Sequence, residues 1–320
     1  LFLFSVVDVH DYFYTQTDKN TDKVMRKQTR AYLLALLAVL FWSTIASALK
    51  ISLRHINYEL LVLYASATAT LFLLLVMMQK KQLRTVFSST RRQYVNSALM
   101  GFLNPFLYYL VLLKAYDLLR AQEAGTLNYI WPLVLTLLSI PVLGQKISWK
   151  SILAIFISFA GIVVISTRGQ VLSMKFDEPF GVILAVSSAF IWAIYWLLNM
   201  KDSRKTLPKL TLNFIFGLGY IFIFLLLRGK LIIPTTEGLF GSIYIGIFEL
   251  GLTFIIWLKA LENSENTAKV SQLIYLSPFI SLFFIHYVVK ENVIIPTIGG
   301  LILIIGGIVL QQYTDRQKKN

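Results

Sequence analysis

Long apolar stretches separated by short polar ones dominate the chain. A run of about 20 apolar residues can cross the hydrocarbon core of a bilayer as a helix. The runs are too continuous for the alternating strands of a membrane barrel, and helices satisfy their own backbone hydrogen bonds in lipid. The pattern predicts an all-α integral membrane protein with ten transmembrane helices, at 31–49, 58–78, 94–114, 121–142, 150–167, 180–199, 210–227, 239–260, 267–289 and 294–312.

The composition agrees with this class. Of the 320 residues, 57% are hydrophobic and 14% charged, whereas soluble domains carry about 25% charged residues. The chain has no cysteine, which excludes disulfides, thiolate metal sites and cysteine nucleophiles. Its three histidines form no cluster with metal-ligand spacing, and no nucleotide-binding loop or nucleophile–base pair is visible. We expect neither a metal nor a cofactor, and no enzymatic activity.

The net charge of +14 has a topological explanation. Basic residues gather in alternate loops, with twenty on the side of the N-terminus and nine on the other side. The positive-inside rule then places both termini in the cytoplasm. We therefore do not expect nucleic acid as a partner.

The ends of the chain are predicted to be cytoplasmic tails, at 1–30 and 313–320. The apolar run at 1–7 is too short for a signal peptide or a span, and Asp8 and Asp11 follow it. Our hypothesis is that 1–24 is a disordered tail or an over-extended start, because Met25 would begin a conventional membrane protein.

The two halves of the chain share a sequence register. At an offset of about 146 residues, matched pairs are Asn104 with Glu249, Tyr129 with Tyr275, Pro132 with Pro278 and Gly161 with Gly307. The register predicts two copies of five helices, at 31–167 and 180–312. Because five is odd, the second copy enters the membrane from the opposite side. Such inverted repeats are typical of alternating access, with the binding site at their interface near the midplane.

The matched prolines Pro132 and Pro278 are candidate hinges, because proline removes a backbone donor and kinks a helix. Prolines are also tolerated in membrane helices generally, which is the alternative explanation. In the last helix of the second half, Gly299-Gly300 and Gly306-Gly307 repeat at a seven-residue spacing that puts small residues on one face. We expect close helix packing there.

Three polar or ionisable side chains are candidates for the substrate cavity. Glu249 lies about ten residues from either end of its predicted helix, where a carboxylate is costly unless it meets a cavity or a partner. A structural hydrogen bond to a neighbouring helix is the alternative. Its repeat-mate Asn104 is polar at the same depth. Glu123 and its repeat-mate Lys269 lie near helix ends, where snorkelling to the interface could also explain them.

Aromatic residues in the predicted spans complete the candidate cavity. Such rings can stack on a planar ligand or hold an ammonium group, although Tyr and Trp also populate the membrane interface. The remaining candidates are the aromatic residues Tyr108, Tyr129, Trp131, Trp192, Trp257 and Tyr275, together with the polar Asn128.

Several motifs resemble a known family. The segments 41–44, 160–163 and 306–309 (Phe-Trp-Ser-Thr, Ala-Gly-Ile-Val and Gly-Gly-Ile-Val) resemble the drug/metabolite transporter superfamily of EamA type, over 31–312. The motif at 123–132 (Glu-x-Gly-x-x-Asn-Tyr-Ile-Trp-Pro), with Gly144-Gln145-Lys146-x-x-Trp149, resembles the aromatic amino acid exporter subgroup of bacterial inner membranes. This resemblance implies a basket-like ten-helix bundle with a central cavity. Glu249 departs from the apolar or small residue that the subgroup implies at its position.

The predicted function is an inner-membrane transporter that exports small metabolites or facilitates their passage by alternating access, with amino acids, aromatic or other, as the first substrate class. The expected partners are the substrate and the lipid bilayer, with a monomer or homodimer as the assembly. One alternative is a proton-coupled antiporter that uses Glu249 or Glu123. Another is a membrane sensor or scaffold that transports nothing.

Overall fold

The computed structural model describes residues 19–143, 149–172, 177–264, 270 and 272–317, and the regular structure in these residues is helical. The predicted all-α class is confirmed for this part of the chain. The first half comprises α2 Lys19–Ser52, α3 Tyr58–Gln79, α4 Leu83–Phe87, α5 Arg91–Gly101, η2 Phe102–Leu107, α6 Tyr108–Leu118, α7 Ala121–Asn128, α8 Trp131–Leu143 and α9 Trp149–Ser166. The second comprises α10 Pro179–Met200, α11 Thr206–Leu227, α12 Thr236–Phe248, α13 Leu252–Asn263, η3 Gln272–Leu276, α15 Ser277–Phe284, η4 Ile285–Val289 and α16 Ile295–Gln317.

Six helical stretches are long and apolar enough to cross a membrane. They are Lys27–Ser52, Tyr58–Gln79, Arg91–Leu118, Pro179–Asn199, Thr206–Leu227 and Thr236–Asn263. Shorter apolar helices are Leu153–Ser166, Leu273–Val289 and Ile295–Leu310. The hypothesis for residues 1–24 falls mostly outside the described residues, as do Lys269 and the motif residues Gly144, Gln145 and Lys146. α2 begins at Lys19, earlier than the predicted start of the first helix.

Helix starts follow local sequence signals. Asn57 caps α3 by accepting a hydrogen bond from the Glu59 amide at 2.9 Å. Thr235 caps α12 in the same way, accepting from the Gly238 amide at 3.2 Å. Such caps satisfy backbone donors that the first helical turn leaves free.

Several of the predicted spans are interrupted by breaks in the regular α-helix. In 94–114 the chain passes through η2, where Asn104 has extended backbone angles of φ −149° and ψ 119°. The span 239–260 is divided between α12 and α13, with Glu249 at the end of α12. The repeat-mates Asn104 and Glu249 therefore both lie at a helix interruption. Interrupted helices leave backbone groups without helical partners, which transporters use at binding sites.

The two matched prolines also stand at interruptions. The span 121–142 is divided between α7 and α8, and Pro132 is the second residue of α8. Pro278 is the second residue of α15, after the short 3-10 helix η3. A proline at the start of a helix costs little, because its missing amide would have no partner there anyway. The helices therefore end before the prolines instead of kinking around them.

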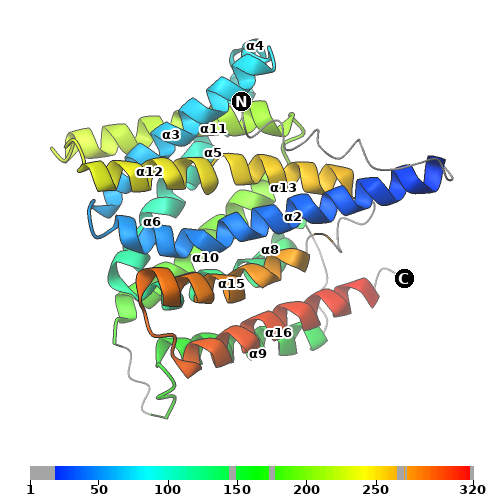
Figure 1. Ribbon diagram of the computed structural model, residues 1–320, viewed down its shortest axis with the longest axis vertical. Coiled ribbons are helices and arrows are strands. Elements are labelled where there is room, and N and C mark those ends of the chain that lie inside the picture. The colour runs from blue at the N-terminus through cyan, green and yellow to red at the C-terminus, as the bar shows by residue number, and fades with distance from the viewer. Residues whose placement is uncertain (1–18, 144–148, 173–176, 265–269, 271, 318–320) are drawn as a thin grey trace.

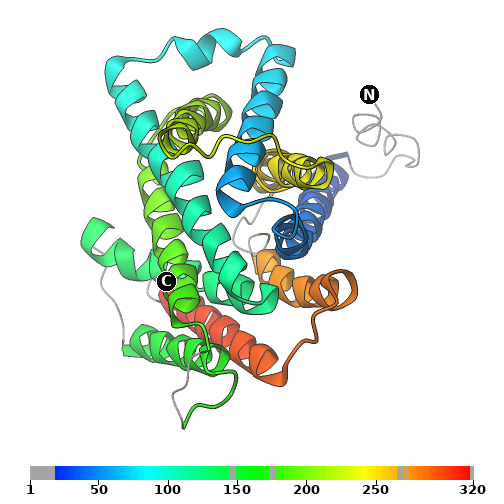
Figure 2. The ribbon, with the colours of Figure 1, turned by 90° about the vertical axis from the view of Figure 1, so that its left-hand side faces the viewer.

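α9 and α16 pack closely along one edge of the bundle, as Figures 1 and 2 both show. A Cβ atom at Gly300 would lie 2.7 Å from the carbonyl oxygen of Gly161. One at Gly307 would lie 2.6 Å from that of Ala154, so the helices run antiparallel. The close approach predicted from the glycine spacing is confirmed for these two glycines. Gly299 and Gly306 face open space.

Candidate substrate site

The end of α12 carries a carboxylate that meets a tyrosine from the first half of the chain. The Tyr109 hydroxyl of α6 donates a hydrogen bond to Glu249 Oε1 at 2.9 Å. Among the described residues, no Lys, Arg or His forms an ion pair with Glu249. The charge of this carboxylate is thus met by a neutral donor only.

An aromatic stack lies next to this carboxylate. Tyr108 is stacked on Trp192 of α10, with 4.6 Å between ring centroids and an interplanar angle of 28°. The edge of Tyr109 meets Tyr108 at 4.8 Å and 75°. The rings continue through Trp192 to Phe254 of α13, at 6.1 Å. Offset-stacked and edge-on rings are the favourable aromatic geometries, so this group is well packed.

An amide and two hydroxyl groups border the stack. Tyr108 donates to Asn128 Oδ1 at 3.4 Å, and Asn128 Nδ2 donates to Ser188 Oγ at 2.8 Å. Asn128 is the last residue of α7, immediately before the interruption of that span. We call Tyr108, Tyr109, Asn128, Ser188, Trp192 and Glu249 the central cluster. It contains four of the ten residues predicted for the cavity.

Trp257 is linked to the central cluster through other rings. Trp42 of α2 lies 5.4 Å from Trp257 and 5.9 Å from Phe254, and Phe254 in turn contacts Trp192. α2 and α13 pack side by side in Figure 1. The two tryptophans therefore extend the aromatic surface across the boundary between the halves.

Asn104 lies in a second polar group. Its side chain is 1% exposed, and its Oδ1 atom has no hydrogen-bond partner. The side-chain amides of Asn104, Asn199 and Asn213 converge on the hydroxyl of Tyr195, which is itself fully buried. Buried amides without all their partners are uncommon and call for an explanation in function or bound water.

Tyr129, Tyr275 and Trp131 surround the interrupted helices. The Tyr129 hydroxyl donates to the carbonyl of Ile274, in η3 of the second half. Tyr275 lies near enough to Tyr129 to interact with it electrostatically. Trp131 packs against the main apolar core. The interruption in the first half thus touches its counterpart in the second.

Glu123 belongs to a group at one end of the bundle, apart from the central cluster. Its carboxylate is 4% exposed and accepts from Arg168 Nε at 2.6 Å. It also accepts from the Arg120 amide at 3.2 Å, and Arg168 pairs further with Asp177. The hydrogen bond that Arg168 donates to Glu123 raises the pKa of Arg168, so the guanidinium stays charged. A cavity of about 10 Å³, room for about one water, lies beside the pair.

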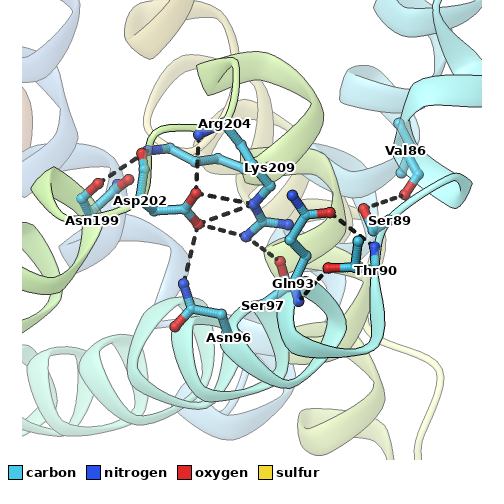
Figure 3. A network of polar contacts seen from close by, with 10 residues as sticks. All are labelled: Val86, Ser89, Thr90, Gln93, Asn96, Ser97, Asn199, Asp202, Arg204 and Lys209. Atoms are coloured by element: carbon cyan, nitrogen blue, oxygen red, sulfur yellow. Dashed lines mark hydrogen bonds and ion pairs between the residues drawn. The ribbon is translucent and has the colours of Figure 1, made fainter.

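A polar network around Asp202, drawn in Figure 3, lies at the end of α10 opposite to the Glu123 group. Arg204 contacts Asp202 at 2.6 Å and donates to Ser97 Oγ of α5 at 2.9 Å. Burial raises the pKa of Asp202, but the hydrogen bonds from Arg204 outweigh it and hold the pKa below its ordinary value. Lys209 donates to the carbonyls of Asn199 and Asp202, at 3.0 and 2.9 Å. The network joins α5, α10 and α11.

Sequence reasoning missed Tyr109 and Ser188. Tyr109 follows Tyr108 in an unbroken apolar context, and the spacing alone does not say which of the two faces Glu249. Ser188 gives a weak signal, as one of two serines in an otherwise apolar span, but serine also packs well between membrane helices. Neither role is visible before the helices are placed.

The comparisons with known proteins decide the family. Residues 29–167 and 179–311 both match the EamA-like transporter family. The chain belongs to this family. This transporter is 26% identical to an uncharacterised transporter of Archaeoglobus fulgidus, over 87% of this chain and 96% of the relative. It is 24% identical to the aromatic amino acid exporter YddG of Escherichia coli, over 60% of this chain and 67% of the relative.

A solved crystal structure supports the fold. It superposes on this EamA-like transporter with a TM-score of 0.64 and 18% identity, covering 92% of this chain and 100% of that chain. The predicted resemblance to the EamA type is confirmed, and the chain is a multi-pass membrane transporter. Its relatives are described as transporters.

Proposed function

We propose that this EamA-like transporter exports small metabolites, amino acids first among them, across the inner membrane of a bacterial cell by alternating access. The observation that carries this proposal is the central cluster, which gathers a carboxylate, an amide and stacked rings at helix interruptions within the membrane. Interrupted helices and convergent polar groups are the features of transporter binding sites. The relative named as an aromatic amino acid exporter supports amino acids as the first class to test.

The contact between α9 and α16 supports ten helices in two inverted repeats, at 31–167 and 180–312. Ala154 meets Gly307, and Gly161 meets Gly300. In the 146-residue register, Ala154 corresponds to Gly300 and Gly161 to Gly307, so the two contacts join the same pair of equivalent positions in opposite order. A two-fold relation produces this reciprocity, and for antiparallel helices its axis lies across them, in the membrane plane.

A second pair of contacts has the same reciprocity. A Cβ at Gly101, in the third span of the first repeat, would lie 2.4 Å from the carbonyl oxygen of Asn213 on α11. A Cβ at the repeat-mate Gly246, on α12, would lie 2.5 Å from the carbonyl oxygen of Ala65 on α3. α11 and α3 are the second spans of the two repeats. Each repeat therefore places its third span against the second span of the other.

Pro132 and Pro278 are the proposed hinges of the conformational change in alternating access. They follow interruptions that touch each other through Tyr129 and the carbonyl of Ile274. Short breaks in helices can absorb the backbone rotations of a conformational change. With both termini in the cytoplasm, the Glu123 group lies at the outer face and the Asp202 network at the inner face. The assembly that we propose is a monomer or homodimer without a cofactor.

Proton-coupled antiport is the second candidate, and one contrast favours Glu249 over Glu123 as the proton carrier. Glu123 forms an ion pair with Arg168 at 2.6 Å. Glu249 has a neutral partner, Tyr109, and no ion pair among the described residues. A membrane carboxylate without a counter-charge gains most from binding a proton or a cation.

The test is transport by purified protein in proteoliposomes, with a panel of aromatic and aliphatic amino acids. Counterflow of at least one amino acid supports the proposal. If none moves, the substrate is not an amino acid. If no metabolite of a wider panel moves either, a sensor or scaffold role replaces transport. Proton coupling predicts that an imposed pH gradient drives flux, and that Glu249→Gln no longer responds to that gradient.

A further inference from the structure

Several basic residues of the bundle have their partners at its ends and not in the central cluster. Lys50 donates to the carbonyls of Tyr116 and Leu119 at 2.8 and 2.6 Å, which caps the end of α6. Arg168 is engaged by Glu123 at the same end. These cations are therefore committed to structural partners at the bundle's end.

Two basic residues near the opposite end are committed as well. Arg204 pairs with Asp202, and Lys209 donates to the carbonyls of Asn199, in α10, and of Asp202, in the loop that follows. Within the described residues, the central cluster consequently has one carboxylate and no cation in contact with it. If a zwitterion bound there, Glu249 would neutralise its ammonium group, but no cation would neutralise its carboxylate.

The side chains around Glu249 in the central cluster are largely aromatic. The stacked rings of Tyr108 and Trp192 extend to Phe254 and, through it, to Trp42. Aromatic faces attract cations and also stack on planar groups. Leaving a buried charge unpaired costs considerably more than such a contact gains. Charge therefore decides which ligand class the site prefers, and the rings add to that preference.

We propose that the central cluster binds an organic cation, a protonated amine on an aromatic body without a carboxylate, with the ammonium group on Glu249. This inference rests on the proposed transport function, and within small metabolites it prefers amines without a carboxylate to the amino acids that are tested first there. Glu249 neutralises the ammonium group, Tyr109 holds the carboxylate by its hydrogen bond, and the Tyr108–Trp192 stack receives the aromatic ring. Asn128, bonded to Ser188, lies where it can meet a polar ring substituent.

The experiment compares three ligands with one aromatic body: phenethylamine (a cation), phenylalanine (a zwitterion) and 3-phenylpropionate (an anion). Binding to the purified full-length protein is measured by calorimetry. We expect phenethylamine to bind at least tenfold more tightly than phenylalanine, with no measurable binding of 3-phenylpropionate. Glu249→Gln lowers the affinity for the amine at least tenfold. Glu262→Gln, an exposed glutamate on α13, is the matched control and leaves the affinity unchanged.

Equal or tighter binding of phenylalanine by the wild-type protein overturns the inference, and this comparison needs no variant to fold. An unchanged amine affinity in a folded Glu249→Gln protein overturns it as well. Counterflow in proteoliposomes separates the two proposals. If the amine binds but nothing is transported, the proposed function fails and the site stands. If amino acids are transported and the amine does not bind, the site assignment fails alone.

Discussion

The hydroxyl of Ser158 donates a hydrogen bond to the carbonyl of Ile304 at 3.2 Å, and the two residues are 146 positions apart. In the proposed two-repeat register they are repeat-mates in contact with each other. A residue that touches its own counterpart lies on the axis that relates the two copies. On either side of this contact, Gly161 meets Gly300 and Ala154 meets Gly307. The seam between α9 and α16 is thus a place where the proposed symmetry can be tested by mutation.

Gly307→Val is expected to destabilise the protein by about 1–3 kcal/mol, because the new side chain would press on the backbone of α9. A Cβ atom there would lie 2.2 Å from Ser158 Oγ and 2.6 Å from the carbonyl oxygen of Ala154. Gly306→Val is the matched control, since nothing lies within 4 Å of its Cβ position. Unfolding of the purified protein in detergent measures both, and equal losses would contradict the packing of this seam.

Arg168→Ala is expected to cost about 3–5 kcal/mol of stability, because it leaves the Glu123 carboxylate buried without a counter-charge. The additional change Glu123→Gln should recover part of the loss, as the uncompensated charge is then gone. Lys114→Ala serves as control. It breaks an exposed pair with Asp117, which is worth at most about 1 kcal/mol. A double-mutant cycle of unfolding free energies measures the coupling, and a value near zero would rule out the buried pair.

Asp202→Asn should lower stability at neutral pH, because the pKa of Asp202 is held below its ordinary value in the folded protein. A depressed carboxylate pKa contributes stability above the ordinary value of 3.8, and this contribution disappears as the pH falls through the folded pKa. The difference in stability between wild type and Asp202→Asn is therefore constant from pH 7 to about pH 5 and shrinks at lower pH. Unfolding temperatures of both proteins across this range measure the difference. A difference that widens toward acidic pH would contradict the Arg204 contact.

Asn128→Ala should reduce transport at least severalfold, because Tyr108 and Ser188 lose their shared hydrogen-bond partner. The loss of a buried hydrogen bond costs about 1–3 kcal/mol. Asn263→Ala, which removes an exposed bond to the Lys259 carbonyl, is the control and should transport normally. Initial rates in proteoliposomes compare the two variants. Full activity of Asn128→Ala would exclude Asn128 from the site. An inactive wild type would instead favour the sensor or scaffold alternative.

Much of the architecture was predictable from the chain alone. Apolar runs of about 20 residues commit the chain to helices in a bilayer, because no other backbone arrangement in these runs satisfies its hydrogen bonds there. The glycine spacing predicted the close approach that Gly300 and Gly307 make. Both signals are local: they depend on side-chain size and polarity along one helix, which the order of residues states directly.

The partners of the charged groups were decided by the tertiary structure. Glu249 and Glu123 look alike in sequence as carboxylates in apolar segments, yet one meets the neutral Tyr109 and the other Arg168. Both contacts join residues that are distant in the sequence, 140 positions apart for Tyr109 and Glu249 and 45 for Glu123 and Arg168. The direction of each side chain also depends on where its helix is interrupted, as at Asn104. Helical periodicity predicts a shared face only while the helix is continuous, because each interruption rotates the residues that follow it.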